Sequence, residues 1–364
     1  MNHIAIKGFY EDVNAQYTPL KYTLYLPWNT SHFNLATIHA SHSHFKSIVF
    51  CKNLEQLAHS YLEKNQHTNI LFCSDLTSVA SLILNVERLV IFQGGFITSL
   101  PKEINTIITA AIKGKIPIFE VPHGLFQSGM NLKDDSKLVN VQSFYDGIGS
   151  NLPSMTKNKS KWYGPDGIGY PRTILKEQYT PRELPNFILI TTNSNWYLYS
   201  AHDKRILFKN IFDFALSKPE SLFIWSPHPA ELNEGAFSRE VINLRPENIL
   251  LYGIDNDIYF HGIEGTDDLI PYCDYGISTL STCVLDYEIH EKSINLFTCI
   301  GVENLICQFE NCSTFSDASL ITSSPALLQT GFLKQYDPIR FDSFLSNDAN
   351  QGSERDNAHL STFL

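Results

Sequence analysis

Short apolar runs alternate with longer amphipathic stretches along the first half of the chain. Runs of strand length, rich in Ile, Val, Leu and Phe, predict buried strands at residues 4–8, 47–51, 69–73, 88–92 and 116–121. Apolar residues at helical spacing between these runs predict helices at 54–64, 76–84 and 101–113. Strands separated by helices of this length are typical of parallel βαβ units.

The same alternation restarts near residue 187, after a segment that is rich in proline and glycine. This segment, residues 150–185, cannot propagate a helix because its prolines interrupt the backbone hydrogen bonds. Beyond it the pattern predicts strands at 187–191, 222–225, 249–252, 259–260, 275–277 and 294–297. Helices are predicted at 203–216, 267–272 and 282–291.

The alternation therefore predicts an α/β protein with two Rossmann-like parallel-sheet domains that face a cleft. We place an N-terminal domain at 1–150, a Pro/Gly-rich connector at 151–185, a C-terminal domain at 186–342 and a polar, disordered tail at 343–364. A chain of 364 residues is long enough for two such cores. Open α/β sheets bind ligands beyond the carboxyl ends of their strands, so we expect the site in the cleft.

Charge and hydropathy limit the classes of partner. The formal net charge of -11 argues against a general nucleic-acid binder, which normally carries a basic face. No apolar run reaches the length of a membrane-spanning helix, and the N-terminus lacks the pattern of a signal peptide. We therefore expect a cytoplasmic protein, with peripheral association at the inner membrane only through a membrane-bound assembly complex.

Two polar motifs follow apolar runs in the second half. Ser226-Pro227-His228-Pro229 follows one strand, and Ser278-Thr279-Leu280-Ser281-Thr282 follows another and leads into a helix. The flanking prolines stiffen the backbone at His228, which suits a side chain that donates a hydrogen bond or a proton to a leaving phosphate. The alternative interpretation is a histidine that only caps a proline turn.

Hydroxyl groups around these motifs are candidates for binding a phosphate-bearing donor. A helix start offers free backbone N–H groups to an anion, although Ser281 or Thr282 also suits a purely structural N-cap. Asp286 lies on the following helix, where a carboxylate can accept hydrogen bonds from ribose hydroxyl groups. The predicted donor-binding residues are Ser226, Pro229, Thr192, Asn193, Ser278, Thr279, Ser281, Thr282 and Asp286.

The first half offers candidates for the acceptor side. His123 follows a predicted strand, and a neutral imidazole there can take a proton from an acceptor hydroxyl group. Asp75 is the rival catalytic base, but it also suits the N-cap of the helix that begins at residue 76. Close approach of a ligand to the backbone is predicted at glycine-rich strand ends, with the acceptor-binding residues Gln93, Gly94, Gly95 and Gly124.

Metal binding is not expected. His39, His42 and His44 form a cluster, but they lack cysteine or carboxylate partners at matching spacing, which favours a solvated loop. No acidic cluster of the metal-binding type is evident, so the predicted site requires no metal and no cofactor besides an activated donor.

The motifs resemble those of GT-B glycosyltransferases that build bacterial surface polysaccharides. His123-Gly124, His228-Pro229 and Ser278 to Thr282 before a helix are similar to motifs of bacterial sialyltransferases, β-Kdo transferases and teichoic-acid polymerases. In those families the His-Pro histidine and the Ser/Thr motif contact the phosphate and nucleotide of a cytidine-activated donor. The resemblance implies these roles for His228, Ser281 and Thr282, and a catalytic role for His123.

The resemblance also implies a function. We expect transfer of Kdo, sialic acid or a related acidic sugar from a CMP-activated donor to a saccharide acceptor in capsule or lipopolysaccharide synthesis. The acidic motif that supplies the base in sialyltransferases has no clean copy here, so the base stays open between His123 and an N-terminal carboxylate such as Asp75. A CDP-polyol phosphotransferase, a pyruvyltransferase and a non-catalytic scaffold subunit remain as alternatives.

Overall fold

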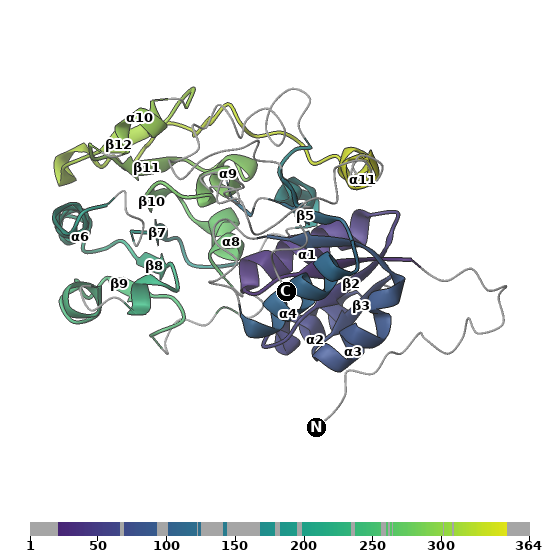
Figure 1. Cartoon of the computed structure of the whole chain (residues 1–364). Coiled ribbons are helices and arrows are strands. Elements are labelled where there is room, and N and C mark those ends of the chain that lie inside the picture. Colours follow the sequence, from purple (N-terminus) through teal and green to yellow (C-terminus); the bar gives the residue numbers. More distant parts are fainter. Residues whose placement is uncertain are drawn as a thin grey trace. The chain divides into compact units, whose positions relative to one another are not determined.

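The computed structural model describes residues 21–65, 69–92, 101–121, 123–124, 141–143, 168–178, 183–194, 199–233, 237–255, 260, 263, 265–300, 302–307 and 309–347. The chain forms two compact units (Figure 1). Unit 1 comprises Met1–Arg172 and Lys334–Leu364, and unit 2 comprises Thr173–Leu333.

Unit 1 contains a six-stranded parallel sheet in the order β3-β2-β1-β4-β5-β6. Its strands are β1 (Tyr22–Leu26), β2 (Lys46–Phe50), β3 (Ile70–Cys73), β4 (Val86–Ile91), β5 (Ile118–Glu120) and β6 (Val141–Ser143). Its helices are α1 (Thr30–His42), α2 (Glu55–Lys64), α3 (Leu76–Leu82), the short η1 (Ile83–Asn85), α4 (Lys102–Lys113) and α11 (Pro338–Asn347). A parallel sheet is usually covered by helices on both faces, which accounts for the buried apolar residues of the central strands β1 and β4.

The first strand and helix of unit 1 differ from the prediction. Residues 21–45 gave no predicted element, yet they form β1 at the centre of the sheet and the 13-residue helix α1. The histidine cluster therefore begins on a helix, and the prediction of a solvated loop is wrong for His39, which is fully buried. The pattern hid α1 because its buried residues include His32, Thr37 and His39, polar types that usually face solvent.

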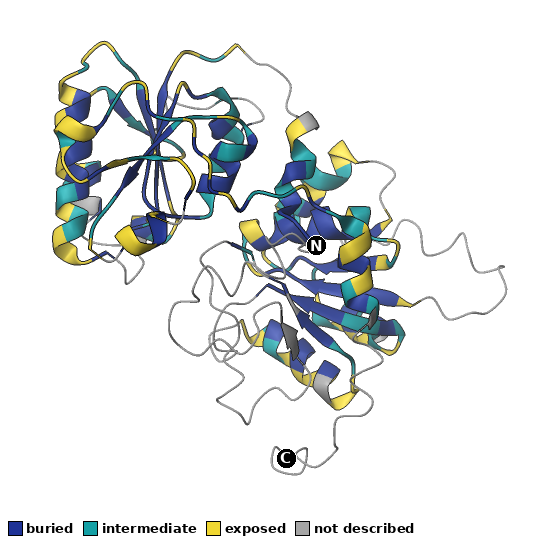
Figure 2. Ribbon diagram, turned by 90° about the horizontal axis from the view of Figure 1, so that it is seen from above, coloured by how far each residue is buried: buried dark blue, intermediate teal, exposed yellow. Residues whose placement is uncertain are grey.

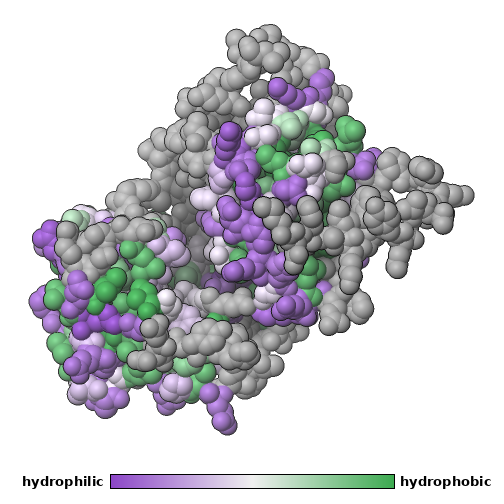
Figure 3. Space-filling view, turned by 90° about the horizontal axis from the view of Figure 1, so that it is seen from below, coloured by the Kyte–Doolittle hydropathy of each residue, from purple (hydrophilic) through white to green (hydrophobic). Residues whose placement is uncertain are grey.

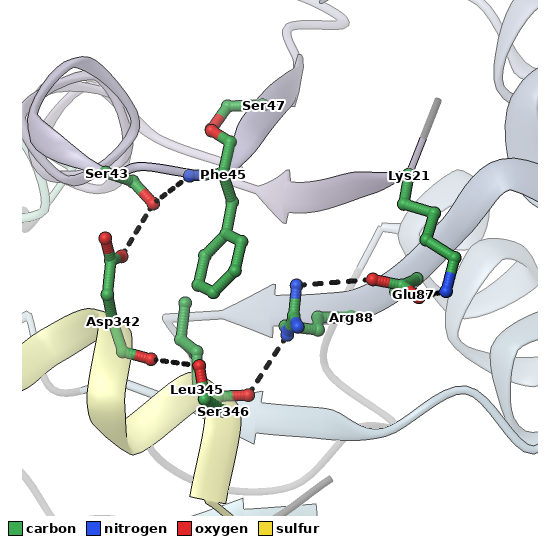
Figure 4. Close-up of polar contacts among 9 residues, drawn as sticks. All are labelled: Lys21, Ser43, Phe45, Ser47, Glu87, Arg88, Asp342, Leu345 and Ser346. Carbon is green, nitrogen blue, oxygen red and sulfur yellow. Dashed lines mark hydrogen bonds and ion pairs between the residues drawn. The ribbon is translucent and has the colours of Figure 1, made fainter. Parts of the chain in front are cut away.

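The C-terminal boundary also differs from the prediction. Residues 334–342 belong to unit 1, and α11 extends to Asn347, into the predicted tail. Asp342 accepts a hydrogen bond from the Ser43 hydroxyl group (2.6 Å), and the Leu345 carbonyl accepts one from Arg88 (3.1 Å) (Figure 4). Asp342 also accepts one from the His44 backbone N–H (2.7 Å). These contacts dock α11 on unit 1, so a short polar-looking segment becomes part of its fold.

Unit 2 contains a second six-stranded parallel sheet, in the order β12-β11-β10-β7-β8-β9. Its strands are β7 (Ile188–Thr192), β8 (Phe223–Pro227), β9 (Ile249–Leu251), β10 (Gly276–Ser278), β11 (Ile294–Phe297) and β12 (Ser313–Phe315). Its α-helices are α6 (Ala201–Leu216), α8 (Thr266–Leu269), α9 (Cys283–Ile289) and α10 (Glu303–Ile306). Short helical segments are η4 (Pro171–Gln178), which begins in unit 1, η5 (Glu231–Asn233), η6 (Ser238–Ile242), η7 (Ile270–Tyr272) and η8 (Ala318–Leu320).

The central strands of both sheets are buried, whereas the helices keep an exposed outer side (Figure 2). In unit 2, Trp225 of β8 packs against Phe208 of α6 and Phe237, with ring centroids 5.9 Å and 5.6 Å apart. A reciprocal capping box between Ser200 and Asp203 begins α6. The predicted fold class, two Rossmann-like parallel-sheet α/β domains, is thereby confirmed.

The surface mixes polar and apolar groups (Figure 3). Leu84 and Ile300 are each more than nine-tenths exposed, at 93% and 91%. Among the residues that the structure describes, no helix has the length and apolarity needed to cross a bilayer.

Candidate active site

The strand order of unit 2 has its switch point between β7 and β10. From β7 the chain continues to β8 and β9 on one side of the sheet, and β10, β11 and β12 lie on the other. Such a switch point leaves a crevice at the carboxyl ends of the two central strands. Thr192 ends β7 and Ser278 ends β10, so the predicted hydroxyl-rich motifs meet at this crevice.

His228 lies beside this crevice in a fixed turn. Its backbone N–H donates to the Thr192 carbonyl (3.0 Å) at the end of β7. Its ring Nδ1 accepts a hydrogen bond from the Ala230 backbone N–H (3.1 Å). Because Nδ1 is an acceptor, the neutral ring carries its proton on Nε2, which makes Nε2 a hydrogen-bond donor.

The environment keeps this imidazole neutral. His228 is exposed at the surface. The protein that surrounds its ring lowers its pKa through desolvation, while the carboxylate of Glu231 opposes that shift. A lowered pKa favours the neutral ring, whose Nε2–H donor is suited to a phosphate oxygen.

Glu231 organises the turn, and sequence reasoning missed it. This carboxylate is fully buried and accepts hydrogen bonds from the Thr192 hydroxyl group (2.7 Å), the Ser194 backbone N–H (2.8 Å) and the His228 backbone N–H (2.9 Å). The Ser194 hydroxyl group donates to it as well. The sequence does contain a sign of a buried acceptor here. The polar residues 191–194 at the end of β7 (Thr-Thr-Asn-Ser) bring hydrogen-bond donors that need an acceptor once they are buried.

The Ser/Thr motif is divided between sheet and helix. The Ser278 hydroxyl group accepts from the Thr191 hydroxyl group (2.8 Å), and the Thr279 hydroxyl group accepts from the Asn193 backbone N–H (2.7 Å). Both side chains are fully buried, so these bonds join β7 to β10. Donor binding by these two residues stays a prediction, and the structure gives both hydroxyl groups a structural task.

The remaining donor-side candidates lie on β8, in the His228 turn, and at the start of α9 or within it. Ser281 accepts from the Cys283 backbone N–H (3.2 Å) at the start of α9, and Thr282 occupies the N-cap position without a side-chain cap bond. Ser226 is hydrogen-bonded to Thr266 (2.7 Å). Pro229 is exposed next to His228, and Asp286 is buried within α9.

In unit 1 the corresponding switch point lies between β1 and β4. From β1 the chain continues to β2 and β3 on one side, and β4, β5 and β6 lie on the other. His123 follows β5, and its Nδ1 donates to the Phe92 carbonyl (2.9 Å), which directly follows β4. A carbonyl oxygen can only accept, so the neutral ring carries its lone pair on Nε2, as a general base requires.

A second histidine, which sequence reasoning missed, packs against His123. The ring of His32, in the first turn of α1, lies with its centroid 4.3 Å from that of His123. His32 is fully buried. Burial, and secondarily the neighbouring His123, lowers the pKa of His32 well below its usual range, so the ring is neutral.

The other acceptor-side candidates do not lie together at this switch point in the described part of the chain. Asp75 is the N-cap of α3 and accepts from the backbone N–H (2.8 Å) and hydroxyl group (2.7 Å) of Ser78. It follows β3, the edge strand, and β2 and β1 separate that strand from the switch point. The structure thus gives Asp75 the capping role. Gly124 is buried beside His123, whereas Gln93, Gly94 and Gly95 lie outside the described residues.

The described part of the chain contains no group of three or more His, Cys, Asp or Glu side chains that could hold a metal ion. The chemistry that its residues offer is acid–base and hydrogen-bonding chemistry at two sheet edges. An Nε2 lone pair lies at the edge of unit 1, and an Nε2–H donor lies at the edge of unit 2.

The fold is similar to that of solved structures. No family model and no curated protein matches the chain. Among solved structures, Methanocaldococcus jannaschii UDP-GlcNAc 2-epimerase in complex with UDP-GlcNAc and UDP is similar at a TM-score of 0.54 and 10% identity, over 90% of this chain and 99% of that one. The fold is GT-B-like.

Two further solved structures are similar at lower scores. The wall teichoic acid polymerase TagF matches at a TM-score of 0.46 and 10% identity, over 93% of this chain and 90% of that one. Staphylococcus aureus MnaA, solved with UDP, matches at 0.46 and 10% identity, over 82% and 85% of the two chains.

Proposed function

We propose that this GT-B-like protein is a glycosyltransferase that moves an acidic sugar, Kdo, sialic acid or a related one, from a CMP-activated donor to a saccharide acceptor. The observation that carries the proposal is the His228 turn of unit 2. There a rigid backbone and the buried Glu231 hold a neutral imidazole with its Nε2–H at the switch-point crevice.

In this mechanism the donor phosphate binds at the carboxyl edge of β7 and β10. As the bond between sugar and phosphate breaks, negative charge grows on the phosphate oxygens. His228 donates from Nε2 to that charge, and the start of α9 at Ser281 and Thr282 adds hydroxyl and backbone donors. Loss of one such donor typically costs about 100-fold or more in kcat.

The acceptor is activated at the edge of unit 1. Nε2 of His123 takes the proton from the acceptor hydroxyl group as that oxygen attacks the sugar. The hydrogen bond from Nδ1 to the Phe92 carbonyl holds the ring in the tautomer that a base needs. A positioned general base contributes roughly 100- to 10,000-fold, so His123→Ala should lose activity within that range.

A UDP-sugar enzyme is the second candidate. The M. jannaschii epimerase, whose fold this chain shares, was solved with UDP-GlcNAc and UDP. The motif resemblance favours cytidine, while this structural likeness favours uridine. The two pyrimidine nucleotides therefore form the decisive comparison.

Thermal unfolding with CMP, CDP, UMP, UDP and GDP tests the proposal. At a hundred times its dissociation constant, a bound nucleotide adds about 2.7 kcal/mol to the free energy of unfolding, which is readily detected as a rise in Tm. We expect CMP to raise the Tm of the wild type, and His228→Ala to weaken that effect. His202→Ala, at an exposed position on α6, serves as the matched control and should respond like the wild type.

The other outcomes separate the alternatives. A response to UDP or UMP alone would replace the cytidine donor with a uridine donor. A response to CDP together with a polymeric polyol-phosphate product would indicate a phosphotransferase. Absence of any nucleotide response would contradict the proposal and favour a pyruvyltransferase or a non-catalytic scaffold.

A further inference from the structure

His32 is a buried imidazole whose two ring nitrogens both lack a hydrogen-bond partner among the residues that the structure describes. Buried polar groups are almost always paired, so an unpaired one calls for an explanation. As a neutral ring, His32 offers one N–H donor and one lone pair. A phenylalanine of similar shape would fill the same space without the cost of desolvating two nitrogens. Packing alone therefore does not account for a histidine here.

The surroundings of His32 lie where a ligand of unit 1 is expected. It stands in the first turn of α1, just beyond the carboxyl end of β1, the strand that borders the switch point. Its ring touches three others. The centroids of Phe92 and His123 lie 5.7 Å and 4.3 Å away, and that of Trp28 lies 5.3 Å away in an edge-on arrangement.

The neighbouring side chains define the chemistry of the ligand. Trp28 is 40% exposed, so its ring gives the site an aromatic wall at the surface. A pyranose ring presents an apolar C–H face and an edge of hydroxyl groups that both donate and accept. An aromatic wall beside a neutral imidazole matches both features, as is typical of small-molecule sites that combine apolar walls with a few polar groups.

We propose that His32 is an acceptor-binding residue, whose N–H and lone pair bind hydroxyl groups of the saccharide acceptor next to the base His123. This rests on the proposed transferase function and deepens it, because it assigns the acceptor site to the β1–β4 edge of unit 1. Trp28 forms the wall on which the sugar ring packs. His32 binds and orients the acceptor, and His123 takes its proton.

Two substitutions give opposite results under the two explanations. His32→Phe keeps the ring packing and removes both nitrogens, whereas His32→Gln keeps a donor and an acceptor and removes the ring. If His32 binds the acceptor, the Phe variant keeps or raises its Tm but loses about 10-fold or more in kcat/KM for the acceptor, and the Gln variant regains part of this loss. If His32 only packs, the Phe variant is the more active of the two.

Controls separate this proposal from the proposed function. The Tm shift with CMP should be the same in both variants as in the wild type, because His32 and the nucleotide site belong to different units. A wild type that does not respond to any nucleotide would contradict the donor assignment, whatever His32 does.

An activity-independent readout completes the test. We would record imidazole ¹⁵N NMR signals of the full-length protein with a panel of free mono- and disaccharides, using His32→Phe to assign the His32 signals. Movement of the His32 signals with at least one saccharide, and not with CMP, is the expected result. Unmoved signals across the whole panel, or a Phe variant as active as the wild type, would overturn the proposal.

Discussion

At the scale of residues, the proposed function depends mainly on His123, His228 and the carboxylate of Glu231. His123 donates from Nδ1 to a carbonyl, and His228 accepts at Nδ1 from a backbone N–H, so their Nε2 atoms have opposite hydrogen-bonding character. His123 and His228 are predictable from the sequence because they follow apolar runs directly. Glu231 and His32 are not, because their importance depends on which donors and rings the fold brings around them.

Replacement of Glu231 by glutamine tests its role as an acceptor. One carboxylate oxygen accepts from the backbone N–H of Ser194 and the other from that of His228, so either orientation of an amide sets its NH₂ against a fixed donor. We expect Glu231→Gln to lower the free energy of unfolding by about 2–3 kcal/mol. Urea unfolding measures this, with the exposed Glu220→Gln as a control that should stay within about 0.5 kcal/mol. Equal stability of the two variants would contradict the assignment.

At the scale of elements, apolar runs located strands well. The runs predicted at 47–51, 69–73, 88–92, 187–191, 222–225, 275–277 and 294–297 correspond to β2, β3, β4, β7, β8, β10 and β11. Buried parallel strands are continuously apolar, which makes them visible in a single sequence. Helix α1 was hidden because its buried face carries histidine and threonine. The strand predicted at 4–8 lies outside the described residues.

Strand β10 tolerates no side chain at its first residue. A Cβ atom at Gly276 would lie 2.4 Å from the ring of Tyr287, which α9 holds fully buried. Gly276→Ala should therefore destabilise the protein by about 1–3 kcal/mol through overpacking. Gly265→Ala is the matched control, because its nearest neighbour is the movable carboxylate of Asp267 at 3.3 Å. Thermal unfolding of both variants measures the difference in stability. A Gly276→Ala protein as stable as the Gly265→Ala control would contradict the close packing of Gly276 against Tyr287.

At the scale of the whole molecule, unit 1 is built from both ends of the chain. The sequence could not reveal this, because α11 is short and its docking depends on partners nearly 300 residues away, such as Ser43 for Asp342. The ring of Phe341 stacks on buried His39, with centroids 4.1 Å apart, and thereby extends the core of unit 1.

Truncation tests this arrangement. A chain that ends at Leu333 loses the bonds of Asp342 and the packing of Phe341, so we expect it to unfold at a clearly lower temperature than the full chain. A chain that ends at Asn347 retains α11 and should match the full chain in thermal unfolding. Equal Tm values for the two truncated proteins would show that α11 does not stabilise unit 1.

Buried histidines make the molecule sensitive to acid. Burial lowers the pKa of His39 from its ordinary value of 6.5 to about 3, so below pH 6.5 the unfolded chain binds a proton that the folded chain does not. Stability is therefore full above pH 6.5 and falls toward pH 3, by about 1.4 kcal/mol per pH unit for this group. His39→Phe should flatten the fall measured by urea unfolding. Tyr336→Phe removes the hydroxyl group that is hydrogen-bonded to His39 but leaves the imidazole in place, so this variant should keep the fall in stability. Equal slopes in all three proteins would contradict this origin.

In the proposed function, His228 presents an Nε2–H donor to a nucleotide phosphate. The most direct test is the imidazole ¹⁵N spectrum of His228 in the full-length protein at pH 7.5, with and without CMP. We expect a neutral Nε2–H tautomer whose signals shift when CMP is added. A neutral Nδ1–H tautomer, or His228 signals that stay unmoved at saturating CMP, would contradict it.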